Sequence, residues 1–246
     1  MTPAISEMQD AGSKVGRFHD DVRLILGAGY FGKRAATILR EMSASPILIV
    51  DKSEDRLAQV ADLPVEKIGC DGVGFLVENF HLLNPSCVIV PAIPVHLAAE
   101  WLKNYLDKSG WHVEAREVPN EIIPVLPHAW QGLGGTLLVS YSDFFCPDDC
   151  AEPFDHCPMT GEKRDLPLHE LLNRINIPDF TTHIIRSRQL APGLGGFMVE
   201  DLRNLLIKAT QGEGKWLVGT ACSCHGVLTA LNIHGKRVTS GELLET

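Results

Sequence analysis

Long apolar runs are missing from this sequence. The longest, residues 46–50 and 86–95, are far shorter than the roughly 20 residues that a membrane-spanning helix needs. The first 20 residues are polar and lack the apolar core of a secretory signal peptide. We therefore expect no membrane partner, a cytoplasmic protein, and a loose arm over residues 1–20.

Basic residues are also scarce. Lys and Arg number 22 against 31 Asp and Glu, which gives a formal net charge of −9. A nucleic-acid-binding protein normally presents a basic face, so this balance argues against a nucleic-acid partner. The hydrophobic fraction of 45% over 246 residues is enough for the core of one large α/β domain or two small ones.

Short apolar runs alternate with helical patterns in the first half of the chain. This alternation is typical of a parallel, doubly wound sheet. The expected strands are residues 22–26, 47–50, 65–68 and 87–90, and the expected helices are residues 31–42, 53–61, 72–83 and 95–106. We predict an α/β fold with a doubly wound, mostly parallel, Rossmann-like sheet and a Cys-containing C-terminal extension.

The second half keeps a similar alternation with more irregular connections. Expected strands are residues 113–118, 136–141, 183–188 and 216–220, the last strand, and expected helices are 167–174, 199–210 and 227–231. Glycine-rich turns are expected at 132–135 and 193–196, and a long loop at 144–164. We predict a dinucleotide-binding domain over residues 21–110 and an α/β part over 111–246, which either continues the same sheet or forms its own.

A glycine pattern follows the first expected strand. Gly27, Gly29 and Gly32 form GxGxxG between that strand and a helix. The first glycine permits a tight turn, the second lets a pyrophosphate approach, and the third allows close helix–strand packing. Asp51 ends the second expected strand, 19 residues after Gly32, where a carboxylate can accept ribose hydroxyls. The carboxylate favours NAD, whereas Lys52 and Arg56 leave NADP open.

These residues carry a family resemblance. The first hundred residues resemble the Rossmann NAD(P)-binding superfamily, including its TrkA-type members, at Gly27, Gly29, Gly32 and Asp51. The resemblance implies that residues 69–71 contact adenine and that the loop 91–94 passes beneath the nicotinamide ribose. The expected cofactor-binding residues are Gly27, Gly29, Tyr30, Phe31, Gly32, Asp51, Lys52, Asp71 and Ala92.

Cysteines form two groups, and each group follows an expected strand. The first contains Cys146, Cys150 and Cys157, and the second is Cys222-Ser-Cys224-His225. Because the carboxyl ends of strands line the crevice of an open parallel sheet, the two groups should converge beside the nucleotide if their strands share its sheet. Gathered thiolates are costly without a cation, so we predict that the first group and Cys222 or Cys224 bind a metal.

Two kinds of metal centre fit these cysteines. Proline after Cys146 and Cys157 occurs in iron–sulfur loops, and zinc would accept the same thiolates although no C-x2-C knuckle is present. A site without metal stays open as well. Cys222 and Cys224 would lie at the N-terminus of the expected helix 227–231, which would lower their pKa and suit a dithiol redox role. His225 and His156 are either acid–base groups, metal ligands or surface side chains.

Three functions remain from the sequence. The first is an NAD(P)-dependent oxidoreductase, with Cys222, Cys224 and His225 as catalytic candidates, acting on a small polar substrate. Arg186 and Arg188 are expected on one face of a strand, where they would favour an anionic substrate. The second is an NAD(H)-responsive regulatory module, and the third is a structural zinc site on a cofactor-binding scaffold. We expect a homo-oligomer.

Overall fold

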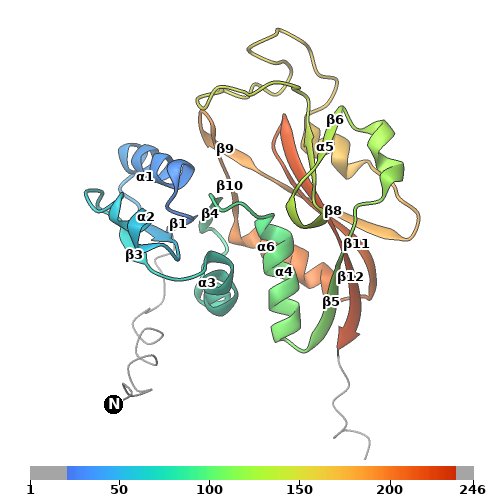
Figure 1. Cartoon of the computed structure of the whole chain (residues 1–246), viewed down its shortest axis with the longest axis horizontal. Helices are drawn as coiled ribbons and strands as arrows, with labels where there is room; N and C mark the ends of the chain where they lie inside the picture. Colours follow the sequence, from blue (N-terminus) through green and yellow to red (C-terminus); the bar gives the residue numbers. More distant parts are fainter. Residues whose placement is uncertain (1–20, 237–246) are drawn as a thin grey trace, which may run out of the picture.

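The structure is a computed structural model that describes residues 21–236. It contains two β-sheets with helices packed between and around them (Figure 1). This is a mixed α/β fold, so the predicted fold class is confirmed at that level. Within residues 21–236 no helix is long and apolar enough to cross a membrane. The arm expected over residues 1–20 lies outside the described residues.

The first sheet has the strand order β3-β2-β1-β4-β10-β9. Strands β1 to β4 are parallel, whereas β10 is antiparallel to both β4 and β9. The bounds are β1 (Arg23–Leu26), β2 (Ile47–Val50), β3 (Glu66–Ile68), β4 (Val88–Pro91), β9 (Arg188–Ala191) and β10 (Leu194–Met198). The four strands predicted in the first half of the chain are therefore confirmed.

Helices cover both faces of the parallel strands. Ile25 packs against Ala35 and Leu39 of the first helix, whereas its neighbour Leu24 belongs to the opposite core with Trp101. Successive strand residues point to opposite faces, so a strand covered on both sides reads as a continuous apolar run. The helices are α1 (Tyr30–Met42), α2 (Glu54–Ala58), α3 (Gly72–Asn79), η2 (Phe80–Leu82), α4 (Leu97–Lys108) and α6 (Val199–Ala209).

The second sheet has the order β6-β7-β12-β11-β8, and β5 pairs with β12. Its strands are β5 (Trp111–Arg116), β6 (His128–Gln131), β7 (Leu137–Ser140), β8 (Phe180–Arg186), β11 (Gly214–Ala221) and β12 (His225–Lys236), and its connections include η3 (Asn120–Val125), η4 (Leu133–Gly135) and α5 (Leu168–Asn173). Both β7 and β11 are antiparallel to β12. They therefore run in the same direction and end at the same edge.

The prediction of a helix over residues 227–231 is wrong, and the strand at residues 216–220 is not the last strand. This segment belongs to β12, which pairs with β11 along eight residues. Leu228 and Ala230 lie in one core, whereas Leu231 and Ile233 lie in the other. Burial of both faces removes the polar–apolar alternation of a half-exposed strand, and tertiary pairing overrides the helical preference of Leu and Ala.

The glycine-rich turn expected at 193–196 is mostly a strand, β10. A side chain at Gly195 would press on Ser187, and one at Gly196 would press on the backbone of Ile89 in β4. These glycines allow close packing between neighbours and do not mark a long turn. Arg186 and Arg188 do not share a strand either, because the chain leaves the second sheet at Ser187 and enters the first.

One core connects the two sheets. The central helices α4 and α6 lie between them (Figure 1). Trp101 and Leu102 of α4 and Leu205 of α6 belong to the same buried cluster as Trp216 of β11 and Leu231 of β12. The two sheets therefore share this buried cluster, and each sheet has a further cluster on its other face.

His96 strengthens this junction at the start of α4. The side chain is buried, and its Nδ1 lies 2.8 Å from Thr229 Oγ1 while Nε2 lies 3.0 Å from Thr220 Oγ1. Each hydroxyl can donate to one ring nitrogen or accept from it, so a neutral imidazole satisfies both contacts. Burial lowers the pKa of His96 to about 3, which keeps the ring neutral at physiological pH.

Replacing this histidine should make stability less sensitive to acid. An unfolded His96 takes up a proton near pH 6.5, but the folded ring does not until about pH 3. The unfolded state thus binds more protons as pH falls from about 7 to 4, which lowers stability. His96→Gln should lose less stability than wild type between pH 7.5 and 5 in urea unfolding. The exposed control His81→Gln should keep the wild-type slope, and an equally steep slope in His96→Gln would contradict this assignment.

Candidate functional site

The turn between β1 and α1 has the backbone that its glycines were predicted to permit. Gly27 has φ of +107°, and a side chain there would overlap the carbonyl of Ala92. A side chain at Gly32 would overlap the carbonyl oxygen of Gly27. In contrast, no atom lies within 4 Å of the position that a Cβ at Gly29 would take. The turn is therefore closed on two sides and open at Gly29.

Asp51 supports this turn from the end of β2. Its Oδ2 accepts a hydrogen bond of 2.8 Å from the Ala28 N–H, and its Oδ1 accepts one of 2.8 Å from the Ser53 N–H. Burial alone would raise the pKa of Asp51, but these two bonds and Arg56, 3.6 Å away, hold it below its usual value. The carboxylate is therefore ionised at neutral pH beside the glycine turn.

The other expected cofactor residues differ in their positions. Ala92 packs against the glycine turn, and its N–H donates to Leu26 O at 2.7 Å. Tyr30 and Phe31 are exposed at the start of α1, and Lys52 is exposed next to Asp51. Asp71 accepts the Gly74 N–H at 2.8 Å and caps α3, so its carboxylate has a structural partner.

Helix α1 contacts the cysteine-containing loop directly. The Tyr30 hydroxyl donates to Asp148 Oδ2 at 2.7 Å, which raises the pKa of Tyr30. Arg34 donates to the carbonyl oxygens of Pro192 and Gly193 at 3.2 and 3.4 Å. The Gly193 N–H in turn donates to Cys150 O at 2.9 Å. These contacts place the expected phosphate-binding turn beside the cysteines.

The structure brings cysteines of both sequence groups to one small cavity. A cavity of about 60 Å³ is lined by Cys146, Cys150, Cys157 and Cys224. The first three come from the loop after β7, at the top of the view in Figure 1, and Cys224 comes from the connection between β11 and β12. Their strands lie in the second sheet, so the condition that they share the sheet of residues 22–26 is not met. They meet because β7 and β11 end at the same edge.

A larger cavity of about 560 Å³ adjoins the small one and shares Cys146, Cys150 and Cys224 with it. Cys222, His225 and Phe31 also line it. His225 Nε2 lies 3.5 Å from Cys146 Sγ, and its Nδ1 lies 4.0 Å from Cys222 Sγ. The catalytic candidates and the beginning of α1 therefore border the same space.

Cys222 and Cys224 do not lie at a helix N-terminus, because β12 begins at His225. Burial instead raises the pKa of each thiol to about 12. The Cys222 sulfur accepts the backbone N–H groups of Cys224 and His225 at 3.4 and 3.3 Å. These bonds favour a thiolate but do not offset the burial, so the low pKa expected for a dithiol redox pair is wrong.

Cys157 has a different environment. Burial opposes its ionisation, but hydrogen bonds from Thr160 and from the backbone of Met159 outweigh it, and its pKa lies below the usual value. Its thiol belongs to a tight turn in which the Gly161 N–H donates to Cys157 O at 2.8 Å. Of Cys157, Cys222 and Cys224, Cys157 is therefore the thiol whose surroundings lower its pKa.

Two charged residues of the site were missed in the sequence. Glu152 lines the larger cavity and accepts the Ser223 N–H, with φ of +48°. Arg164 lines the small cavity and donates to Pro153 O at 2.6 Å. Both lie in the loop after β7. In the sequence, only their position close to the spaced cysteines of that loop could have indicated them.

Other candidates lie apart from the cavities. His156 is half-buried and pairs with Asp155 at 2.7 Å. Arg188 forms an ion pair of 2.6 Å with Asp201, so its charge is already partnered, and Arg186 is exposed at the end of β8. Neither arginine lines the two cavities.

Fold and site together define an α/β protein of two sheets, with a glycine turn beside paired cysteine-lined cavities. Residues 98–234 match the family described as AF_1314_C, "Uncharacterized protein, C-terminal domain", and the chain belongs to this family. It is similar to an "Uncharacterized protein" of Archaeoglobus fulgidus, with 36% identity over 222 residues that cover 85% of this chain and 98% of that protein. No solved structure matches the chain.

The glycine turn predicts that two similar substitutions differ in their cost to stability. Gly32→Ala should lower the free energy of unfolding by at least about 2 kcal/mol, because its methyl group would overlap the Gly27 carbonyl. Gly29→Ala should cost less than about 1 kcal/mol, since the space is open and only the helix N-cap changes. Urea unfolding of both variants checks this. Equal losses in the two would show that the turn has a different backbone.

Proposed function

We propose that this protein is an NAD(P)-dependent oxidoreductase whose cysteine-ligated centre lies beside the dinucleotide. One observation carries the proposal. Phe31, at the start of the helix that follows the glycine turn, lines the same cavity of about 560 Å³ as Cys146, Cys150, Cys222 and Cys224. A dinucleotide whose pyrophosphate lies at the turn would extend toward the cysteines.

The strand order supports a Rossmann-like, doubly wound half. Strands β3-β2-β1-β4 are parallel, and the turn lies at the carboxyl end of β1, where such sheets bind dinucleotides. Helix α1 offers backbone N–H groups at its start, and no side chain caps them. The open space at Gly29 is where a pyrophosphate would approach the backbone.

The proposed dinucleotide is NAD or NADP. The ionised Asp51 would accept the ribose hydroxyls of NAD and repel a 2′-phosphate. Arg56, with a half-exposed side chain 3.6 Å from Asp51, and Lys52 would favour NADP instead. Comparing the affinities for the two dinucleotides decides between them.

The donor set of the small cavity fits a centre with four thiolate ligands. Tetrahedral zinc would hold thiolate sulfurs about 3.8 Å apart, given Zn–S bonds of about 2.3 Å. Within residues 21–236 no three cysteine sulfurs all lie within 4.8 Å of one another, so no three of them have the spacing of a zinc site. We therefore favour an iron–sulfur cluster over zinc. We also propose a cytoplasmic location, where thiols stay reduced.

The residues of this chain would perform distinct tasks. A bound cluster would supply one-electron transfer and the dinucleotide hydride transfer. A small polar substrate would lie in the larger cavity, whose polar lining includes Thr220, Ser187 and Glu152. When an alcohol substrate loses a hydride from its carbon to NAD(P)+ and becomes a carbonyl, its hydroxyl proton must also leave. Burial lowers the pKa of His225, so its neutral ring is available to accept that proton.

A nucleotide-responsive regulatory module is the second candidate. It is favoured by the hydrogen bond from Tyr30 to Asp148, since dinucleotide binding at the turn would act directly on the cysteine loop. Such a module would change the loop without turning over a substrate. Hydride exchange between NAD(P)H and a panel of small ketones and aldehydes distinguishes the two functions.

Dinucleotide binding should depend on Gly29. Gly29→Ala places a methyl group in the space proposed for the pyrophosphate, and we expect binding of NAD(P)H to become undetectable by calorimetry while the fold persists. Gly212→Ala is the matched control, because Gly212 lies in open space in the loop before β11. Unchanged affinity in Gly29→Ala would remove the dinucleotide site from this turn.

The cysteine centre should depend on Cys150. Protein purified without oxygen should contain iron and acid-labile sulfide and absorb broadly in the visible range, and Cys150→Ser should lose both. The protein should also become less stable, because ligand binding holds the loop. Cys70→Ser is the control, since Cys70 lines neither cavity. A colourless protein with about one zinc would favour zinc, and wild-type protein without metal would overturn the centre.

A further inference from the structure

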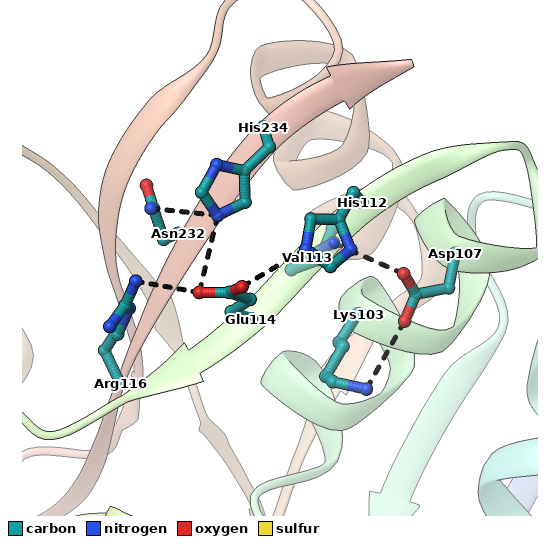
Figure 2. Close-up of polar contacts among 8 residues, drawn as sticks. All are labelled: Lys103, Asp107, His112, Val113, Glu114, Arg116, Asn232 and His234. Atoms are coloured by element: carbon teal, nitrogen blue, oxygen red, sulfur yellow. Dashed lines mark hydrogen bonds and ion pairs between the residues drawn. The ribbon is translucent and has the colours of Figure 1, made fainter. Parts of the chain in front are cut away.

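A second cluster of metal-ligating side chains lies on the surface of the second sheet, outside both cysteine-lined cavities. It consists of His112 and Glu114 on β5 and His234 on β12, as Figure 2 shows. One ligand atom from each residue lies within 4.8 Å of the other two. Among residues 21–236 this is the one group of three His, Cys, Asp or Glu side chains that meets this spacing.

Strand geometry produces this cluster. His112 and Glu114 are two residues apart on β5, so their side chains leave the same face of the sheet. Glu114 is paired with Asn232 of the antiparallel strand β12, and His234 lies two residues further on. The two imidazole rings stack with centroids 4.9 Å apart at 25°. Pairing of β5 with β12 therefore brings the three side chains together without a loop.

The spacing suits a single metal ion. Two ligands bound to one ion at about 2.0–2.1 Å with a tetrahedral angle lie roughly 3.4 Å apart. His112 Nε2 lies 3.2 Å from Glu114 Oε1, and His234 Nε2 lies 3.5 Å from Glu114 Oε2. A small side-chain adjustment would point both nitrogens and one carboxylate oxygen at a common ion.

The surroundings hold these side chains in place. Arg116 Nη2 lies 2.7 Å from Glu114 Oε2 (Figure 2). The Asn232 amide donates to His234 Nε2 at 3.0 Å, and a bound ion would replace this hydrogen bond. The Arg116 charge opposes a cation, but its contact also fixes the carboxylate that would balance one. The side chains of the three ligands are 38–43% exposed, which leaves room for an ion to arrive and for water to complete its coordination.

We propose that His112, Glu114 and His234 bind one divalent transition-metal ion that joins β5 to β12. Two imidazoles and a carboxylate are a donor set for Zn²⁺, Co²⁺ or Ni²⁺ and are too nitrogen-rich for Mg²⁺ or Ca²⁺. The ion would bridge β5 and β12. Because β5 joins the sheet through its pairing with β12, the ion would stabilise the edge formed by β5. This site is independent of the dinucleotide and the cysteine centre.

Cobalt(II) is the probe that separates the two sites. Cobalt bound by nitrogen and oxygen gives weak visible bands, whereas cobalt bound by thiolates adds intense charge-transfer absorption in the near ultraviolet. The full-length Cys150→Ser variant serves as background, because it weakens the cysteine centre and leaves β5 and β12 unchanged. We expect it to bind cobalt with the weak bands and without that ultraviolet absorption.

Removal of one ligand should abolish this binding. In the same background, His234→Ala and the isosteric Glu114→Gln should lower cobalt affinity at least about 10-fold, since even a residue that only orients a metal ligand typically costs that much. His81→Ala, an exposed histidine on η2, is the matched control and should bind as before. Zinc should raise the melting temperature of the background and control but not of the two ligand variants.

Each outcome decides the proposal. If His234→Ala and Glu114→Gln are folded by circular dichroism and bind cobalt as tightly as their background, the three residues form a hydrogen-bonded cluster only and the proposal is overturned. The same conclusion follows if the background binds no cobalt with nitrogen–oxygen bands. The cysteine centre is judged by iron and sulfide content, so failure of one site leaves the other intact.

Discussion

The cysteine loop after β7 is held by the turn between β9 and β10. The Gly193 N–H and the Gln189 side chain both donate to Cys150 O, at 2.9 and 2.8 Å. Gly193, with φ of +68°, approaches the Asp148 carbonyl so closely that no side chain fits there. The same turn accepts hydrogen bonds from Arg34 of α1. One turn therefore positions the cysteines relative to both sheets.

The two halves of the chain also share a sheet and a buried cluster. The family match over residues 98–234 begins in α4 and includes β9 and β10, which extend the first sheet beyond β4. Strands of the matched region therefore complete a sheet that begins before it. The buried cluster around Trp101 continues this connection through both sheets. Because this cluster is shared, a change at the junction should affect both halves.

The cost of burying thiols shapes the site. Burial raises the pKa of Cys222 and Cys224 to about 12, so their uncharged forms are favoured unless a cation is present. The nearby Arg164 lowers the pKa of Cys224, but its effect is smaller than that of burial. Glu152 adds negative charge and acts in the other direction. The proposed metal centre would supply such a cation.

Local sequence determined the parts of the structure that depend on neighbouring residues. The spacing of Gly27, Gly29 and Gly32 predicts a turn that the backbone adopts, because Gly27 has a positive φ and Gly32 lies against the Gly27 carbonyl. The alternation over residues 22–106 predicts the strands and helices found there, since a sheet covered on both faces selects short apolar runs. The strand before each cysteine group was also predicted, and so was the meeting of those groups at strand ends.

Tertiary structure alone decided the rest. Residues 227–231 form a strand because β12 pairs with β11, β7 and β5, and no local pattern encodes those partners. The same pairing sets Cys222 and Cys224 at a hairpin, raises their pKa by burial, and brings His112 and Glu114 to His234. Arg186 and Arg188 separate because the chain changes sheets at Ser187. Contacts between residues far apart in the sequence fixed these features, and local sequence carries no record of such contacts.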